Sequence, residues 1–339
     1  MLEVSKAPSD IQIVGIVNSF NRLSLLQEAL PSLCTALEQS GLAAGVVVFE
    51  AGSDDGSQAW LAEQVAASNR VPVKVIGVAS GGDTSFSAGL NQACRCALEQ
   101  LAVCEWLLFF ETDNWISGPE PLQHAVALLR EQPELAGAGW TVRRRNGGRV
   151  GFGCSFPQVV EFVLGQQLTL RLKLDQRQKL FWRRSLSRTR WCVSEVVFTS
   201  PLLVRRAAWE RSGGMDAGEF PFSDCDIDWA WRVRKLGGML AVLDLPGVVH
   251  DNRGRQSAWS ERRLIEWHRA RLRLLRRHRR AATSLLKPVL FFRHLCEYLL
   301  IAVAYRPASR RREALAKRSA LCRGVWSDYN KSTSQHGLS

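Results

Sequence analysis

The regular alternation of strand-like and helix-like segments over residues 11–110 is the feature that most constrains how this chain can fold. Short apolar runs that end in polar residues have the composition of buried strands, and the segments between them space their leucines and alanines as helices do. Strands that alternate with helices pair mostly in parallel, because each helix carries the chain back to the starting edge of the sheet. We therefore predict an α/β fold with a mostly parallel sheet flanked by helices.

The expected elements follow from this pattern. We predict strands over residues 11–20, 45–50, 71–79 and 105–110, and helices within 22–39, 51–68 and 81–101. Pro31 is expected to bend the first helix. Ser53 or Asp54 is expected to cap the second helix, because short polar side chains accept hydrogen bonds from free amides at a helix start. Later we predict a strand and turn within 194–215, a helix after the acidic stretch 223–228, and a last strand ending at His250.

Two acids, Glu111 and Asp113, directly follow the fourth predicted strand in the stretch FFETDNW. Alternate residues of an extended chain point to the same side, so both carboxylates share one face. A divalent cation between them would relieve their repulsion, and Mg²⁺ prefers one or two carboxylates plus phosphate oxygens. Ligands of parallel sheets bind beyond the carboxyl ends of the strands, where Glu50 also lies. The alternative interpretation is a solvated loop.

Positive charge is concentrated near the C-terminus. The chain has 45 Lys and Arg against 32 Asp and Glu, and residues 261–325 hold 18 of the basic and only 4 of the acidic residues. These basic residues are interleaved with leucine, phenylalanine and tryptophan, a pattern typical of a helix on an anionic membrane surface. A solvated basic helix and a nucleic-acid contact are the alternatives, and we expect no nucleic-acid partner.

Other composition features narrow the class of protein. The nine cysteines have no metal-ligand spacing and indicate a reducing compartment. The first ten residues lack the apolar region of a signal peptide, and no window reaches the ~18 uninterrupted apolar residues of a membrane span. We expect a cytoplasmic protein that is peripheral on the inner face of the cytoplasmic membrane.

Seven sequence fragments carry a resemblance to a known family. In chain order over residues 11 to about 257 they are VGIVNSFNRLSLLQEALPSL, VVVFEAGSDDGS, FSAGLNQA, WLLFFETDN, SPLLVRRAAWERSGGM, CDIDWAWRVRKLGG and VVHDNRG. Together they resemble the inverting family 2 glycosyltransferases with the GT-A fold, especially the rhamnosyltransferase-like branch. The resemblance implies a GT-A catalytic domain over 1–258, with a nucleotide half at about 1–118 and an acceptor half at about 119–258. The basic amphipathic helical segment 259–326 and the polar tail 327–339 follow.

The resemblance implies a site for a nucleotide-diphosphate sugar. Its expected residues are Asn18, Phe20, Asn21, Arg22, Glu50, Ser53, Asn91, Glu111 and Thr112. The Glu50 carboxylate can accept a hydrogen bond from the N3–H of uracil or thymine, so the donor is expected to be a UDP- or dTDP-sugar. A loop acid that caps the next helix is the alternative for Glu50, and a buried structural amide is the alternative for Asn91.

The resemblance also implies a metal site. Glu111-Thr112-Asp113 matches the family's Asp-x-Asp motif with Glu in the first position, and Asp113 and His250 are the expected ligands of Mg²⁺ or Mn²⁺. The cation would neutralise the diphosphate as it leaves the sugar. A surface histidine at the end of a strand is the alternative for His250.

The catalytic base is expected near the start of the helix that follows residue 223. The family pattern Glu-Asp-x-Asp-x-x-x-Arg, counted back from Arg232, puts Cys225 at the Glu position and Asp226 at the base position. Inversion needs one base to deprotonate the acceptor hydroxyl. Asp224 or Asp228 could substitute. The expected acceptor-binding residues are Asp228, Trp229, Trp231, Arg183 and Arg184, although core packing is the commoner role of a helical tryptophan and Asp228 could cap the helix.

These features favour an enzyme that transfers a sugar to a glycan or lipid-linked acceptor with inversion, with an anionic membrane surface as a further partner. The two departures from the family motifs, Glu111 and Cys225, support the alternative that the protein binds a nucleotide sugar without turnover. Binding of nucleic acid through the basic C-terminal segment is the less favoured alternative.

Overall fold

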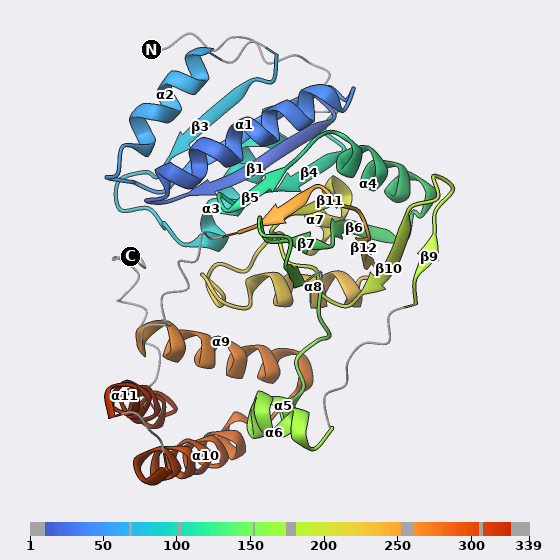
Figure 1. Cartoon of the computed structure of the whole chain (residues 1–339). Coiled ribbons are helices and arrows are strands. Elements are labelled where there is room, and N and C mark those ends of the chain that lie inside the picture. The colour runs from blue at the N-terminus through green and yellow to red at the C-terminus, as the bar shows by residue number, and fades with distance from the viewer. Residues whose placement is uncertain are drawn as a thin grey trace. The chain divides into compact units, whose positions relative to one another are not determined.

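The computed structural model describes residues 11–67, 70–100, 103–151, 153–173, 181–251, 261–304 and 308–326 (Figure 1). Contacts between residues divide the chain into two units. Unit 1 takes its described residues from 1–155 and 178–254, and unit 2 takes them from 156–177 and 255–338. Residues 156–177 were expected within the first domain from the sequence, but the structure groups them with the C-terminal helices.

Unit 1 is built on a nine-stranded sheet with the order β3-β2-β1-β4-β11-β6-β12-β10-β9. The strands are β1 (Ile13–Ser19), β2 (Ala44–Glu50), β3 (Val73–Gly77), β4 (Trp106–Phe109), β6 (Leu135–Trp140), β9 (Arg183–Arg184), β10 (Arg190–Ser194), β11 (Leu202–Arg205) and β12 (Met239–Leu243). The first four strands of this order are parallel, and β11 runs antiparallel between β4 and β6. The predicted mixed α/β fold with a central sheet flanked by helices is confirmed.

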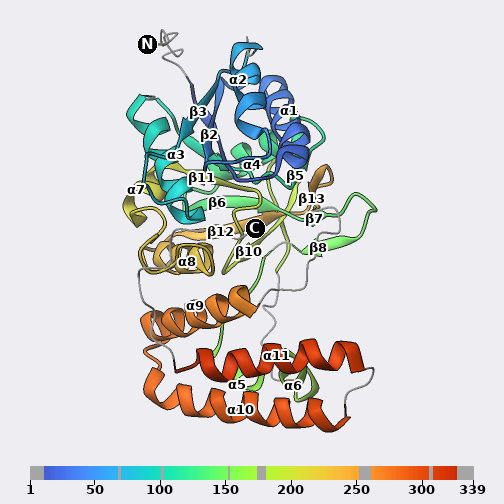
Figure 2. The same cartoon turned by 90° about the vertical axis from the view of Figure 1, so that its left-hand side faces the viewer.

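The helices of unit 1 cover both faces of this sheet. They are α1 (Leu23–Gln39), α2 (Ser57–Ala67), α3 (Phe86–Gln100), α4 (Glu120–Glu131), α7 (Arg206–Ser212) and α8 (Cys225–Lys235). The chain steps outward from β1 to β3 through α1 and α2, and α3 then returns it to β4. Because such crossovers are right-handed, α3 lies on the face opposite α1, as Figure 2 shows.

Two local details differ from the sequence prediction. Helix α2 begins at Ser57, and the side chain near its start is Asp55, whose Oδ1 accepts a hydrogen bond from the Ser57 amide at 3.1 Å. Neither Ser53 nor Asp54 caps it. The segment expected to be a turn after β11 forms the short helix α7. Pro31 lies inside α1, where Leu30 and Leu33 are buried on either side of it.

A second, four-stranded sheet in unit 1 has the order β5-β13-β7-β8. Its strands are β5 (Asn114–Ile116), β7 (Val142–Arg143), β8 (Arg149–Gly151) and β13 (Val248–His250). The antiparallel pairing of β13 with β5 sets His250 opposite Asn114. This register brings the last residue of β13 beside Asp113, which immediately precedes β5.

Unit 2 is helical. It comprises α5 (Val159–Leu164), α6 (Gln166–Arg171), α9 (Glu261–Arg279), α10 (Thr283–Ala304) and α11 (Ala308–Gly324). Phe162, Leu272, Leu275, Leu290 and Val325 form its small apolar core. Helix α10 packs against α11 and α5, and α11 packs against α9. Among the described residues, no helix combines the length and the apolar character needed to cross a bilayer.

Candidate active site

The strand order of unit 1 reverses at the neighbouring strands β1 and β4. The chain leaves β1 through α1 and reaches β4 through α3, which lies on the opposite face, and open α/β sheets bind their ligands beyond the carboxyl ends of the strands at this kind of switch point. Ser19 ends β1, and the stretch from Phe110 to Asp113 continues from β4. The predicted acid pair therefore lies where the fold favours a ligand.

Asp113 lies at the centre of a cluster drawn from three parts of the chain. Its Oδ2 is 3.4 Å from Nη1 of Arg22, which precedes α1, and its Oδ1 is 3.3 Å from Nδ1 of His250 at the end of β13. Asp113 and Thr112 are buried, and Glu111 is half-buried. The structure thus brings together the two predicted metal ligands and one residue of the predicted nucleotide loop.

Several buried polar atoms at this edge lack a hydrogen-bond partner among the described residues. They are Oγ of Ser19, Oδ1 of Asp113 and Nδ2 of Asn114. Buried polar atoms are nearly always paired in folded proteins, so each exception calls for an explanation. Three of them at one edge of the sheet indicate a polar ligand there.

The two acids differ in their proton affinity. Burial, followed by the neighbouring Asp113 carboxylate, raises the pKa of Glu111 to about 7. Burial also acts to raise the pKa of Asp113, but the imidazole of His250 and the guanidinium of Arg22 outweigh it and hold this pKa below its ordinary value. Asp113 is therefore the acid that stays ionised at neutral pH and the better ligand for a cation.

The residues present fit a divalent cation only in part. No three His, Cys, Asp or Glu side chains in the described part of the chain form a ready metal cage. Asp113 supplies a carboxylate, and His250 supplies an imidazole whose Nδ1 lies 3.3 Å from Oδ1 of that carboxylate. A cation held by one or two protein ligands and completed by diphosphate oxygens suits this set.

Two residues that the sequence analysis did not select hold the His250 ring. Its Nδ1 lies 2.9 Å from Oγ of Ser200 and 3.2 Å from Oδ1 of Asn114, and the Ser200 hydroxyl donates to Asn114 Oδ1 at 3.1 Å. A third, Thr199, lies 3.4 Å from Glu111 through its hydroxyl. Asn114 stands beside the acid pair in the sequence, but nothing local distinguishes Thr199 and Ser200.

The predicted base, Asp226, is half-buried in the first turn of α8 and its charge contributes to the raised pKa of Glu111. Its Oδ1 accepts a hydrogen bond from the Ile227 amide at 2.9 Å. The start of α3 holds the preceding loop, because Ser87 donates from Oγ to the Phe220 carbonyl at 2.5 Å. This long-range contact ties the loop before α8 to α3.

Cys225, which stands at the family's Glu position, is buried, and burial raises the pKa of its thiol. Its Sγ lies 3.7 Å from the carbonyl of Phe222. The thiol therefore replaces the carboxylate of the family pattern with a neutral side chain. A neutral thiol accepts hydrogen bonds only weakly compared with such a carboxylate.

The loops after β1 and β2 are joined by hydrogen bonds. The backbone N–H of Asn21 donates a hydrogen bond to Oγ of Ser53 at 2.9 Å. The side-chain Oδ1 of Asn21 accepts a hydrogen bond from the backbone N–H of Asp54 at 2.9 Å. Asn18 donates from Nδ2 to the Phe86 carbonyl at 3.2 Å, and Phe20 is half-buried. These contacts order the segment in which the nucleotide was expected.

Glu50 has a role within its own loop. One carboxylate oxygen accepts from the Gly52 amide and the other from the Ser53 amide, both at 2.9 Å, and the residue is buried. Because both oxygens already organise this turn, the structure favours the loop-acid alternative over a contact with the base of a nucleotide.

Four other predicted site residues serve the interior of unit 1. The Asn91 amide makes two hydrogen bonds to the backbone of Met215. Asp228 is fully buried, and Trp231 is also buried. Trp229 is buried and donates a hydrogen bond from Nε1 to Oγ of Ser212 at 2.8 Å. These placements favour structural roles over contacts with nucleotide or acceptor.

Arg183 and Arg184 are exposed and form β9, the last strand of the large sheet. Five strand spacings separate β9 from β4, which corresponds to roughly 24 Å. Arg183 stacks its guanidinium 5.5 Å from the ring centroid of Trp191. The structure does not bring these two arginines to Asp113.

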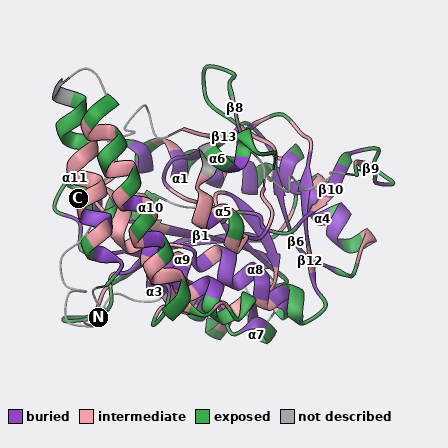
Figure 3. Cartoon of the chain, turned by 90° about the horizontal axis from the view of Figure 1, so that it is seen from below, coloured by how far each residue is buried: buried purple, intermediate pink, exposed green. Residues whose placement is uncertain are grey.

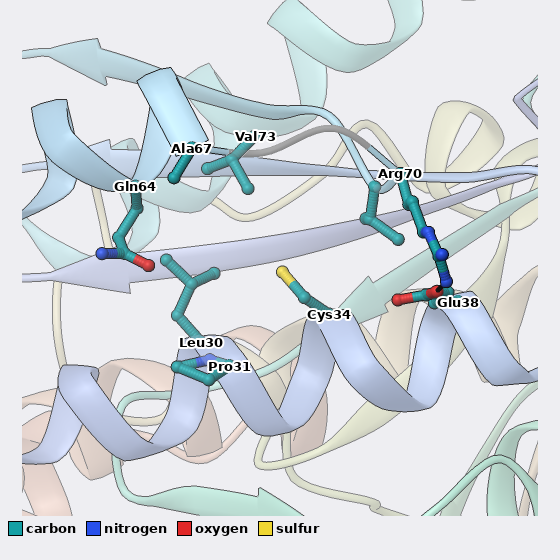
Figure 4. Close-up of a pocket in the computed structure, with 9 residues that line it drawn as sticks. Leu30, Pro31, Cys34, Glu38, Gln64, Ala67, Arg70 and Val73 are labelled. Carbon is teal, nitrogen blue, oxygen red and sulfur yellow. Dashed lines mark hydrogen bonds and ion pairs between the residues drawn. The ribbon is translucent and has the colours of Figure 1, made fainter.

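A separate pocket of about 330 Å³ lies between α1 and α2 (Figure 4). Leu30, Cys34 and Val73 line it, and an ion pair between Arg70 and Glu38 borders it. Val73 is the first residue of β3, so this pocket is at the amino end of the strands. It is distinct from the cluster around Asp113 at the carboxyl ends.

No protein-family model matches the sequence, and no curated protein matches it. Solved structures do match. A mannosyltransferase from Pyrobaculum calidifontis, solved with GDP-mannose and Mn²⁺, is 15% identical with a TM-score of 0.55, and the match covers 93% of this chain and 86% of that one. GalNAc-T7, solved with UDP, GalNAc and Mn²⁺, is 12% identical with a TM-score of 0.55, and the match covers 91% of this chain and 55% of that one. At these identities the likeness shows the fold, which is that of GT-A-like glycosyltransferases.

Proposed function

We propose that this protein transfers a sugar from a nucleotide-diphosphate sugar to a glycan or lipid-linked acceptor, with inversion at the anomeric carbon. One observation carries the proposal: an ionised, buried carboxylate lies between Arg22 and His250 at the switch point of a GT-A-like sheet. The fold supports the class of reaction, and the cluster supports the position of the diphosphate.

The donor's diphosphate would lie over Asp113, and a divalent cation bound there would supply charge neutralisation to the leaving group. Asp113 and His250 would hold this cation, with Ser200 and Asn114 orienting the imidazole. Arg22 is partly exposed beside Asp113, where its guanidinium can pair with a phosphate oxygen. Glu111 would contact the ribose or the cation through its longer side chain.

The chemical step needs one base. The acceptor oxygen attacks the anomeric carbon opposite the diphosphate, the bond from that carbon to the diphosphate oxygen breaks, and its electron pair leaves with the diphosphate. The acceptor hydroxyl gives its proton to Asp226, which lies near Glu111 in the first turn of α8. Asp228 is already paired with Arg232, so the structure favours Asp226 for this role.

A nucleotide-binding module without turnover is the second candidate. The buried neutral thiol of Cys225 at the family's carboxylate position favours it, because that thiol cannot accept hydrogen bonds as a carboxylate does. Measurement of nucleoside diphosphate released from UDP-, dTDP- and GDP-sugars separates an enzyme from this silent module.

The first test measures nucleotide binding by calorimetry. We expect UDP or dTDP to bind more tightly with Mn²⁺ or Mg²⁺ than with a chelator, because a cation held by Asp113 would neutralise part of the diphosphate charge. Asp113→Asn should remove that gain by eliminating the ionised ligand. Asp83→Asn, an exposed loop acid outside the cluster, is the matched control and should keep it. Equal affinity with metal and with chelator in the unmodified protein would contradict the metal site.

A further inference from the structure

Helix α10 of unit 2 exposes an apolar face along its whole length. Leu285, Val289, Phe292, Cys296, Leu299, Leu300 and Val303 form this surface, which we term the outer face of α10, and all seven are exposed. Phe292 is 63% exposed and Val303 is 87% exposed. Apart from the adjacent pair Leu299 and Leu300, they are spaced by three or four residues, which places them on one side of the helix over roughly 27 Å. Figure 3 shows exposed positions along this helix.

The rotation of α10 is held by contacts on its other side. Leu290 belongs to the core of unit 2, and Nε2 of His294 lies 3.1 Å from Nε2 of His268 in α9. Arg293 donates to the Phe162 carbonyl of α5 at 2.7 Å, and Glu297 pairs with Arg318 of α11 at 3.2 Å. These buried and polar contacts keep the outer face directed away from the helices that α10 packs against.

The outer face itself carries no charge. The charged residues of α10 are Lys287, Arg293 and Glu297, and the last two are used in contacts with other helices of unit 2. An uncharged stripe of this size on a helix is uncommon on a protein surface unless it binds something. The sequence around it is strongly basic, with 18 Lys and Arg against 4 Asp and Glu over residues 261–325.

We propose that the outer face of α10 docks onto an anionic lipid bilayer, with the helix parallel to the membrane surface. The apolar stripe would enter the boundary between headgroups and acyl chains, and the basic residues of α9 and α11 would approach the anionic headgroups. This surface is separate from the proposed catalytic cluster of unit 1, so the proposal does not depend on the transfer reaction.

The basic charge of unit 2 and its apolar outer face together favour an anionic bilayer over a second copy of the chain or a nucleic acid. A second copy of the chain, packed face to face through α10, would bring two strongly basic segments together and be opposed by their repulsion. A nucleic acid would engage the arginines but leave the apolar outer face in water. An anionic bilayer satisfies both features at once.

The test is sedimentation of the full chain with vesicles of phosphatidylcholine alone or mixed with phosphatidylglycerol. We expect binding to the mixed vesicles that salt weakens but does not abolish, because the apolar contribution is not screened. The double variant Phe292→Glu, Leu299→Glu should lower the partition coefficient at least about tenfold. Leu236→Glu, which adds a charge at an exposed leucine of unit 1, should bind like the unmodified protein.

A second measurement needs no substitution. Cys296 is exposed on the outer face, so a charged maleimide should alkylate it several-fold more slowly when mixed vesicles are present, as measured by peptide mass spectrometry. The proposal is overturned if that rate does not change or if the double variant, folded by circular dichroism, binds vesicles normally. It is equally overturned if the chain is a dimer that the double variant dissociates, or if it prefers duplex DNA to mixed vesicles at physiological salt.

Discussion

Two aspartates of α8, only two positions apart, have different surroundings. Asp228 is fully buried and accepts from Nε of Arg232 at 2.8 Å, and the same guanidinium donates to the carbonyls of Ser212 and Gly214. Asp226 is half-buried, and its negative charge helps to raise the pKa of Glu111. A buried pair resists loss of either partner, because the remaining charge would lie in a poorly solvated place.

This contrast predicts different consequences for the two substitutions. Asp228→Ala should lower the free energy of unfolding by about 3–5 kcal/mol, because it leaves the Arg232 guanidinium without its carboxylate. Asp226→Asn should change it by less than about 0.5 kcal/mol but lower sugar-transfer turnover by ~10²–10⁴. Urea denaturation and nucleoside diphosphate release measure the two effects. Full turnover in Asp226→Asn would rule out this residue as the base.

At the scale of elements, the close approach of α3 to β1 and β2 shapes the candidate nucleotide region. A Cβ at Gly89 of α3 would lie 2.6 Å from Cδ1 of Phe49 and 2.8 Å from Nδ2 of Asn18. Asn18 in turn donates to the Phe86 carbonyl at the start of α3. Glycine at this position therefore lets the helix pack tightly against the ends of the strands that border the site.

Gly89→Ala should destabilise unit 1 although alanine is the better helix former. The gain in helix propensity is about 1 kcal/mol, whereas overpacking costs typically about 1–3 kcal/mol, and Phe49 is fully buried with little room to move. We also expect weaker nucleotide binding, because displacement of Asn18 disturbs its loop. Gly77→Ala is the control, since its Cβ would meet nothing within 4 Å. Equal urea midpoints for the two variants would contradict this packing argument.

At the scale of the whole molecule, the two units depend on different interactions. Unit 1 buries a large apolar core on both faces of its sheet, whereas unit 2 has a small core and places His268, His294 and Glu297 among its helices. Burial, followed by the charges of His294, Arg293 and Arg318, lowers the pKa of His268 to about 3. Burial also lowers the pKa of His294 despite the nearby Glu297 carboxylate.

These shifts predict that unit 2 is sensitive to acid. A histidine whose pKa is lowered in the folded state binds protons more readily when unfolded, so its contribution to stability is lost as pH falls below its ordinary value of 6.5. Glu297 acts in the same direction below pH 4.5, because its hydrogen bond with His294 and the charges of Arg293 and Arg318 outweigh its burial and lower its pKa to about 2. The hydrogen-exchange protection factors of α9 and α10, which are corrected for the intrinsic exchange rate at each pH, should therefore fall between pH 7 and pH 5 more than those of unit 1.

A substitution separates this effect from general acid sensitivity. His294→Gln should reduce the difference in protection factor between pH 7 and pH 5 within α9 and α10, because one of the two protonation sites is removed. His124→Gln in α4 of unit 1 is the control and should leave the difference in unit 2 unchanged. Protection factors in unit 2 that are the same at both pH values would argue against the histidine pair.

Local patterns predicted much of unit 1 correctly because they depend on neighbouring residues. The strand expected over residues 45–50 is β2, and the helix expected over 22–39 is α1. The same patterns failed where long-range packing chose the structure. Residues 156–177 join the C-terminal helices, and Arg206–Ser212 form a helix rather than a turn.

The sequence by itself determined the order of strands and helices over residues 11–110 and the position of an acid pair at the end of β4, since apolar periodicity and chain polarity are local properties. Only the tertiary structure decided which side chains meet that pair. The pairing of β5 with β13 brings His250 to Asp113, and burial assigns Asp228 and Trp229 to the interior. Such contacts join residues far apart in the chain, and their register depends on the whole sheet rather than on any one segment.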